Sequence, residues 1–109
     1  QAFGGPLWNQ QGVRMKLAQL AAKAAAARAL AYQAAELAAA GKECLREVSM
    51  VKALSPEVLH EVVHGCLQLH GGSGFMRGTA IERMVRDARV LTIGGGATEV
   101  MLEEVAKRM

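Results

Sequence analysis

The longest regular pattern in the sequence runs from residue 9 to residue 40, where apolar side chains recur at mostly alternating spacings of three and four. An α-helix has 3.6 residues per turn, so this spacing places them on one face of a single helix about 48 Å long. Asn9 is the expected N-cap, and Gly41 is expected to end the helix. The apolar stripe consists of Val13, Leu17, Leu20, Ala24, Ala27, Ala31, Ala34 and Leu37. A helix this long and this rich in alanine requires closely packed neighbours.

A second apolar pattern extends from about residue 43 to residue 69 and predicts another long helix. Pro56 interrupts it. Because proline lacks a backbone N–H and crowds the preceding turn, we expect a kink or a break there, with Ser55 acting as a cap. The glycine-rich tract at residues 71–74 is expected to end the helix. The side chains expected to face inward are Val48, Val51, Leu54, Val58, Val62 and Cys66.

Two shorter helices are predicted after this tract, at residues 80–89 and 98–107, with three glycines at residues 94–96 between them. Their inward side chains are expected to be Ile81, Met84 and Val85 in the first, and Val100, Met101 and Val105 in the second. Hydrophobic residues make up 51% of the chain and aromatic residues only 4%, so the interior is built from small and aliphatic side chains. The predicted fold is all-α, a single domain that forms an antiparallel four-helix bundle.

The charge pattern argues against two classes of partner. The net charge is +3, and the basic residues are mixed with acidic ones instead of forming a stripe, so no nucleic acid is expected to bind. No apolar run of about 18 residues or more occurs, and no membrane partner is expected. Without a recognisable signal peptide, Cys44 and Cys66 are expected to be reduced thiols. The expected location is the cytoplasm, or the mitochondrial matrix in a eukaryote.

Residues 60–64 match the H-E-x-x-H signature of zinc peptidases, in which two histidines bind the metal and the glutamate activates a water molecule. The extended signature needs a glycine at its eighth position, so that the chain turns and a third histidine reaches the metal. Leu67 occupies that position here, and a continuing helix would carry His70 about 9 Å along the axis from His64. A zinc peptidase is therefore rejected and no metal ligand is predicted. His60, Glu61 and His64 are expected on a solvent or subunit face.

Four ordered motifs span the chain. They read Q-A-F-G at residues 1–4 with Gln10 and Gln11 after it, Q-L-H-G-G-S-G-F at 68–75, R-D-A-R at 86–89, and I-G-G-G-A-T-E at 93–99. In this order and spacing they resemble segments of the acyl-CoA dehydrogenase family, namely R-x-x-F-G…Q, Q-x-x-G-G-x-G-[FY], R-D-A-[RK] and I-x-[EG]-G-[TA]-[ST]-[EQ]. The leading arginine of the first segment is absent. The resemblance covers essentially the whole chain.

The resemblance implies that residues 1–109 are the C-terminal α-helical domain of an acyl-CoA dehydrogenase, without that domain's first helix and without the N-terminal α and middle β domains. In the family this domain forms the core of a homodimer or homotetramer and contacts FAD. The implied contacts with the FAD of a neighbouring subunit are Gln1, Ala2, Phe3, Gln10, Gln11, Gln68, Leu69, His70, Gly71 and Gly72. The implied contacts with the subunit's own FAD are Ala97, Thr98 and Glu99, and Gly96 is implied to contact the substrate.

These residue types suit the implied roles. Gly71 and Gly72 allow the backbone to approach a ligand closely, and free backbone N–H groups at a helix start suit a pyrophosphate. The side-chain amides of Gln11 and Gln68 donate hydrogen bonds without carrying a charge.

Members of the family oxidise the Cα–Cβ bond of an acyl-CoA thioester, with a glutamate as base and the flavin as hydride acceptor, and usually pass the electrons to an electron-transfer flavoprotein. Many members carry this glutamate where the present sequence has Gly95, which cannot act as a base. Other members place it on the first helix of the C-terminal domain, which would lie before residue 1, and we expect the parent enzyme to be of this type. The alternative is that it has lost dehydrogenation.

No catalytic residue is therefore assigned within residues 1–109, and the isolated chain is expected to be inactive. The alternative function is a helical self-association module without bound flavin or activity.

Overall fold

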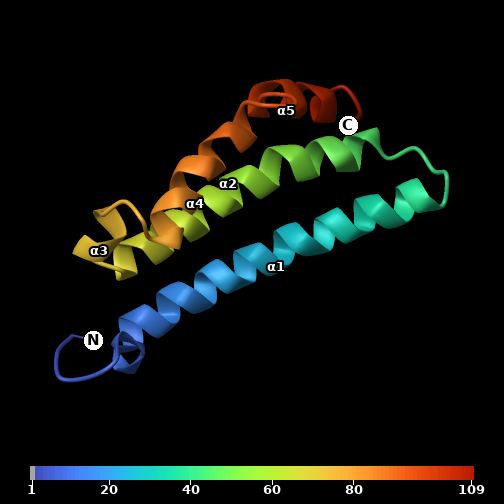
Figure 1. The fold of residues 1–109 in the computed structure, drawn as a ribbon. Coiled ribbons are helices and arrows are strands. Elements are labelled where there is room, and N and C mark those ends of the chain that lie inside the picture. Colours follow the sequence, from blue (N-terminus) through green and yellow to red (C-terminus); the bar gives the residue numbers. More distant parts are fainter. Residues whose placement is uncertain (1) are drawn as a thin grey trace.

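The computed structural model describes residues 2–109, which form five α-helices and two 3₁₀ turns (Figure 1). The helices are α1 (Gln11–Ala39), α2 (Leu45–Leu69), α3 (Gly72–Phe75), α4 (Ala80–Ala88) and α5 (Thr98–Ala106). The 3₁₀ turns are η1 (Leu7–Asn9), before α1, and η2 (Arg89–Thr92), directly after α4. No strand is present between residues 2 and 109, where the backbone pair Ala2 and Gly5 forms an isolated bridge.

Helix α2 lies in the middle of the molecule, and the other helices are arranged around it. Helix α1 runs antiparallel to α2 along one side, whereas α4 and α5 lie along the opposite side (Figure 1). The short helix α3 sits at the end of α2 and leads into α4. The predicted all-α antiparallel bundle is confirmed, and it is arranged in three layers with α2 as the central one.

The contact between α1 and α2 depends on a glycine. A Cβ atom added at Gly65 would stand 2.8 Å from Cδ1 of Leu20, which is too close for two carbon atoms. Leu20 is 3% exposed and packs into the space that the missing side chain leaves. One turn further along, Lys23 on α1 binds both carboxylate oxygens of Glu61 on α2, at 2.6 and 2.7 Å. Gly65 in mid-helix costs about 1 kcal/mol of helix propensity and permits this close approach.

The predicted end of α1 is confirmed, whereas its predicted N-cap is wrong. Gly41 has a φ of 66°, and the N–H groups of Gly41 and Lys42 donate to the carbonyls of Ala38 and Leu37, each at 3.0 Å. This pairing is a Schellman motif, which needs a residue in the left-handed conformation. At the other end the N-cap is Gln10, not Asn9, and its side chain makes no capping hydrogen bond.

Asn9 does not cap α1 because it belongs to the 3₁₀ turn η1. The guanidinium of Arg14 donates to the carbonyls of Trp8 and Asn9, at 2.9 and 2.8 Å, and so holds this turn against the first turn of α1.

Of the expected kink or break at Ser55 and Pro56, the break does not occur, because α2 is continuous from Leu45 to Leu69. The kink stays a prediction. Pro56 removes the hydrogen bond that its N–H would have given to the carbonyl of Lys52. Pro56 is buried, and the helix is packed on both sides. Tertiary packing of this kind outweighs the local preference of one residue.

The core of the domain is thin. The buried apolar residues are Leu20, Ala27, Ala34, Ala53, Val63 and Ala88. Four residues that the sequence pattern placed inward are instead exposed, namely Val48, Leu54, Met84 and Val100. The radius of gyration is 17.0 Å, compared with about 13 Å for a compact domain of this length. A single central helix cannot cover both faces of its neighbours, so much apolar surface faces outward.

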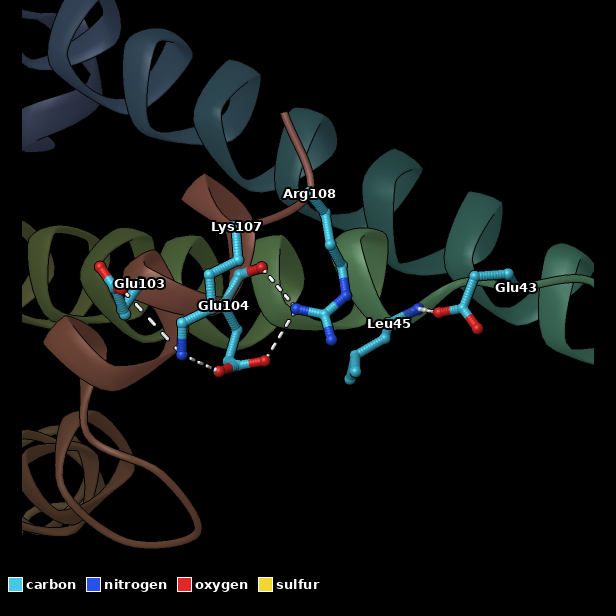
Figure 2. Close-up of polar contacts among 6 residues, drawn as sticks. All are labelled: Glu43, Leu45, Glu103, Glu104, Lys107 and Arg108. Carbon is cyan, nitrogen blue, oxygen red and sulfur yellow. Dashed lines mark hydrogen bonds and ion pairs between the residues drawn. The ribbon is translucent and has the colours of Figure 1, made fainter.

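The C-terminal end of α5 is held by a cluster of charged side chains (Figure 2). Glu104 binds Lys107 at 2.9 Å and Arg108 at 2.8 Å, and the guanidinium of Arg108 also donates to the Glu104 carbonyl. These hydrogen bonds, first that of Lys107 and then that of Arg108, hold the pKa of the Glu104 carboxyl below its ordinary value of 4.5. Nearby, the Glu43 carboxylate accepts a hydrogen bond from the backbone N–H of Leu45 at 3.0 Å and caps the start of α2.

Replacing Leu20 by alanine is expected to lower the free energy of unfolding of the domain by about 3 kcal/mol, because it leaves a cavity against Gly65. Urea unfolding followed by circular dichroism measures this change. Met15 is on the same helix but is 65% exposed, and Met15→Ala is expected to change the free energy by less than about 0.5 kcal/mol. Equal losses for the two variants would contradict the packing described for α1 and α2.

The lowered pKa of Glu104 predicts a loss of stability in acid. A carboxyl with a lower pKa in the folded state stabilises the fold above its unfolded pKa, and this contribution disappears as the pH falls through the folded value. The melting temperature of Glu104→Gln is therefore expected to fall less between pH 6 and pH 3 than that of the unsubstituted protein. Glu36→Gln, on the exposed side of α1, is the control and is expected to leave the pH dependence unchanged.

Candidate functional site

One end of the molecule gathers segments that are far apart in the sequence. The antiparallel packing places the beginning of α1 beside the end of α2, where Lys16 and Leu20 lie against Gly65. The N-terminal segment and α3 are at this same end of the molecule (Figure 1). The predicted flavin-contact residues at positions 2–11 and 68–72 are therefore brought to one end. Gln1, which belongs to the same prediction, is outside the described residues.

The N-terminal segment begins with a tight turn that presents an aromatic side chain. The N–H of Ala2 donates to the carbonyl of Gly5 at 3.0 Å, and the N–H of Gly5 donates to that of Ala2 at 3.3 Å. The two central residues have positive φ angles, 55° at Phe3 and 81° at Gly4, as in a type I′ turn. A positive φ is uncommon for an aromatic residue and is typical of functional positions. The Phe3 side chain is 88% exposed at the tip of the turn.

Three glutamines at this end present amide groups to solvent. Gln10 and Gln11 lie at the start of α1, and Gln68 lies in the last turn of α2. All three are exposed. Each amide offers two donor hydrogens and an acceptor oxygen to a ligand.

The glycines in the segment after α2 differ in whether the fold requires a residue without a side chain. Gly71 has a φ of 57°, which a side chain would strain. At Gly74, an added Cβ would stand 2.8 Å from the carbonyl oxygen of Leu67. At Gly72, by contrast, an added Cβ would meet no atom within 4 Å, and its φ is not positive. The fold therefore requires Gly71 and Gly74, whereas Gly72 has no requirement within the described residues.

The neighbouring residues Leu69 and His70 complete the end of α2. The Nδ1 atom of His70 lies 2.9 Å from the Cys66 carbonyl, and the hydroxyl of Ser73 donates to the His70 carbonyl at 2.7 Å. Leu69 is half-buried, and the His70 ring is exposed beside the glycines.

A second set of predicted contact residues lies at the start of α5. Ala97 is the N-cap of this helix and provides no side-chain acceptor, so the first N–H groups of α5 lack intrahelical partners. The hydroxyl oxygen of Thr98 is buried and has no hydrogen-bond partner among the described residues. Glu99 follows in the first turn and is exposed. An unpaired buried hydroxyl and free N–H groups together form a place where a ligand can accept and donate hydrogen bonds.

The glycine turn before α5 has a fixed backbone shape. Gly95 and Gly96 have φ angles of 71° and 112°. A Cβ added at Gly96 would stand 2.7 Å from Cε of Met101, so the helix side chain occupies that space. Gly95 carries no carboxylate.

Glu82, on α4, is bound by Arg86, and this hydrogen bond holds the pKa of the Glu82 carboxyl below its ordinary value. Glu82 is thus poorly suited to act as a base.

The two sets of residues are separated within one copy of the domain. Thr98 lines a groove together with Met50 of α2. Gln68 lies about 27 Å along α2 from Met50 at 1.5 Å per residue. The start of α5 and the end of α2 therefore lie far apart along the length of α2.

The two histidines of the H-E-x-x-H stretch are engaged elsewhere. The Nε2 atom of His60 lies 2.9 Å from the carbonyl oxygen of Ala88, and Nδ1 of His64 lies 2.8 Å from the His60 carbonyl oxygen. Glu61 is paired with Lys23. Helix α2 continues through Leu69, as the rejection of the zinc site required. Within residues 2–109 no group of three His, Cys, Asp or Glu side chains is placed to hold a metal ion.

The profile of the family described as "Acyl-CoA dehydrogenase, C-terminal domain" matches residues 1–109. The chain belongs to the acyl-CoA dehydrogenase family. Members of this family are FAD-dependent oxidoreductases, and the chain matches their C-terminal helical domain.

Individual relatives agree with this assignment. Acryloyl-CoA reductase (NADH) of Anaerotignum propionicum is 43% identical over 110 residues, which cover 97% of this chain and 28% of the relative. The caffeyl-CoA reductase-Etf complex subunit CarC of Acetobacterium woodii is 37% identical over 98 residues, or 90% of this chain and 26% of the relative. A crystal structure of a probable acyl-CoA dehydrogenase from Mycobacterium abscessus superimposes with a TM-score of 0.95 at 40% identity, over 99% of this chain and 29% of that one. The chain thus spans a little over a quarter of the length of these relatives.

In addition, no helix among residues 2–109 combines the length and apolar character that crossing a bilayer requires.

The unpaired hydroxyl of Thr98 leads to a prediction that can be tested without a bound ligand. Thr98→Val removes a buried polar atom that lacks a partner, so the domain without flavin is expected to gain up to about 1 kcal/mol in its free energy of unfolding. Thr92 is also buried, but its hydroxyl donates to the Arg89 carbonyl and accepts from the Arg89 guanidinium. Thr92→Val is the matched control and is expected to lose stability. A loss of equal size in both variants would show that the Thr98 hydroxyl has a partner.

Proposed function

We propose that this domain is part of a flavoenzyme that α,β-dehydrogenates acyl-CoA thioesters, to which it contributes FAD contacts and the core of an oligomer. The observation that carries the proposal is a pair of segments with free hydrogen-bonding groups, one where the start of α1 meets the end of α2 and the other at the start of α5. Both present hydrogen-bonding groups that the described chain leaves free, namely the amides of Gln11 and Gln68 and the hydroxyl of Thr98.

The residues present fit FAD. Thr98 has an unsatisfied buried hydroxyl, and Gly72 is a glycine whose missing side chain the fold itself does not require. The two segments are separated along α2, which supports the assignment of one to a neighbouring subunit's flavin and the other to the subunit's own. In this proposal the first set is Gln1, Ala2, Phe3, Gln10, Gln11, Gln68, Leu69, His70, Gly71 and Gly72, and the second is Ala97, Thr98 and Glu99.

The bound flavin would supply the hydride acceptor for oxidation of the Cα–Cβ bond. The chain's own part is to bind, to orient and to exclude water. In the proposal Gly96 lies beside the substrate. Gly95 cannot remove a proton, so the catalytic glutamate is placed outside residues 1–109, and the alternative is a parent protein without dehydrogenation. The isolated chain is accordingly proposed to be inactive.

The large exposed apolar surface supports an oligomer. The core is thin, and apolar side chains such as Leu102, Val100 and Val90 are exposed. Such surfaces are typical of protein interfaces. We propose that copies of the domain associate in a homodimer or homotetramer, and that the remaining apolar surface is covered by a preceding helix and by the N-terminal α and middle β domains. The short coverage of the relatives supports this arrangement.

The proposed partners of the whole protein are an acyl-CoA and an electron-transfer flavoprotein. The latter is supported by the name of the relative from Acetobacterium woodii, which is a subunit of a complex with Etf. The proposed location is the cytoplasm, or the mitochondrial matrix in a eukaryote. The alternative function, a self-association module without flavin, is supported by the exposed apolar surface alone and does not explain the unpaired Thr98 hydroxyl.

Gly72→Ala in the full-length protein that carries this domain tests the proposal. The fold tolerates a Cβ at this position, so the melting temperature of the flavin-free protein is expected to stay unchanged. FAD affinity is expected to fall about tenfold, equivalent to about 1.4 kcal/mol, because the methyl group occupies the space of the cofactor. Fluorescence titration of the apoprotein with FAD measures the affinity.

Gly12→Ala is the matched control, since an added Cβ at Gly12 would also meet no atom within 4 Å and Gly12 is not among the proposed contacts. Equal FAD affinity in Gly72→Ala and in the unsubstituted protein would contradict the assignment of the glycine segment. A complete absence of FAD binding by the unsubstituted protein would favour the self-association module.

A further inference from the structure

Two side chains of α2 hold the connection between α4 and α5. The ammonium group of Lys52 donates to the Leu91 carbonyl oxygen in η2, at 2.5 Å. His60 lies two turns further along α2, and its Nε2 atom, taken as the protonated nitrogen, donates to the Ala88 carbonyl at 2.9 Å. Both carbonyls lie near the ends of short helices, where lysine or histidine side chains commonly bind backbone acceptors.

The Lys52 side chain also lies against the glycine turn. Its Cε atom is 3.8 Å from the position that a Cβ atom on Gly95 would take. Lys52, Leu91 and Gly94 line one groove. The aliphatic stem of the lysine therefore lies beside the turn, while the ammonium group binds the backbone a few residues earlier.

The turn itself has few constraints of its own. Glycine loses more conformational freedom on folding than any other residue type, and here three glycines follow one another. The N–H of Gly94 donates to the Val90 carbonyl at 2.7 Å, but Gly95 and Gly96 adopt left-handed conformations that other backbone bonds do not fix. A contact from a rigid neighbouring helix is needed to hold this backbone in one place.

We propose that Lys52 is a positioning residue that holds the turn at residues 94–96 in its place beside the substrate. It acts through the Leu91 carbonyl, which lies shortly before the turn, and does not itself touch the reacting atoms. The role in the reaction rests on the proposed function, because that proposal places Gly96 beside the substrate and the start of α5 beside the flavin. The mechanical part, a lysine on α2 that fixes the turn, rests on the geometry alone.

The test uses the full-length flavin-loaded protein and two variants at one position. Lys52→Met keeps the aliphatic stem and removes the ammonium group, whereas Lys52→Arg restores a cationic donor. Hydrogen–deuterium exchange is measured on peptides that span residues 89–97 and on peptides from α1. Lys52→Met is expected to raise exchange in residues 89–97 about fivefold, the effect of one lost hydrogen bond of this kind, and to leave α1 unchanged. Lys52→Arg is expected to restore the original exchange.

Kinetics with a series of acyl-CoA substrates provide the second readout. Lys52→Met is expected to lower kcat/KM about fivefold at unchanged FAD content, and Lys52→Arg is expected to recover most of it. Lys42→Met is the control, because Lys42 is an exposed lysine in the turn between α1 and α2.

Unchanged exchange at residues 89–97 in Lys52→Met would overturn the proposal, as would an equal rise in α1, which would show a general loss of stability. If the unsubstituted protein oxidises no acyl-CoA, the proposed function fails, while the exchange data still decide whether Lys52 holds the turn.

Discussion

The close approach of α1 and α2 at Gly65 is the constraint on which the rest of the structure depends. Leu20 fills the space above this glycine, and the two helices contact each other along their length. Because α2 is shared by both sides of the molecule, its position also determines where α4, η2 and α5 lie. The positions of the glycine turn and of the start of α5 therefore depend on a helix contact on the opposite side of α2.

The helices themselves were predictable because each depends on its local pattern. The spacing of apolar residues gave α1 and α2, and Gly41 gave the end of α1. A break at Pro56 does not occur and Asn9 is not the cap of α1, for the same physical reason. In both cases a contact with another part of the chain outweighed a local preference: helix packing around Pro56, and the Arg14 guanidinium on the turn that contains Asn9. The exposure of Val48 and Val100 was missed because periodicity identifies an apolar face but not what covers it.

In the candidate site, too, some features can be read from the sequence and others only from the structure. The motifs located the segments, since glycines, amides and their spacing are visible in the sequence. The structure added their spatial separation, the unpaired hydroxyl of Thr98 and the free space at Gly72. Lys52 was missed altogether, although one signal was available: a lone cation between Val51 and Ala53 in an otherwise apolar stretch. Its partner, the Leu91 carbonyl, lies 39 residues away in the chain, and such a contact leaves no periodic trace.

The thin core has a consequence for how this domain responds to damage. A domain with so few buried side chains draws much of its stability from whatever covers its outer faces, so folding and association become a single equilibrium governed by mass action. Substitutions on the exposed apolar surface would then weaken the protein most when it is dilute. The same substitutions would be masked at high concentration, where association restores the missing burial. The apparent tolerance of such a position is therefore set by protein concentration as much as by its chemistry.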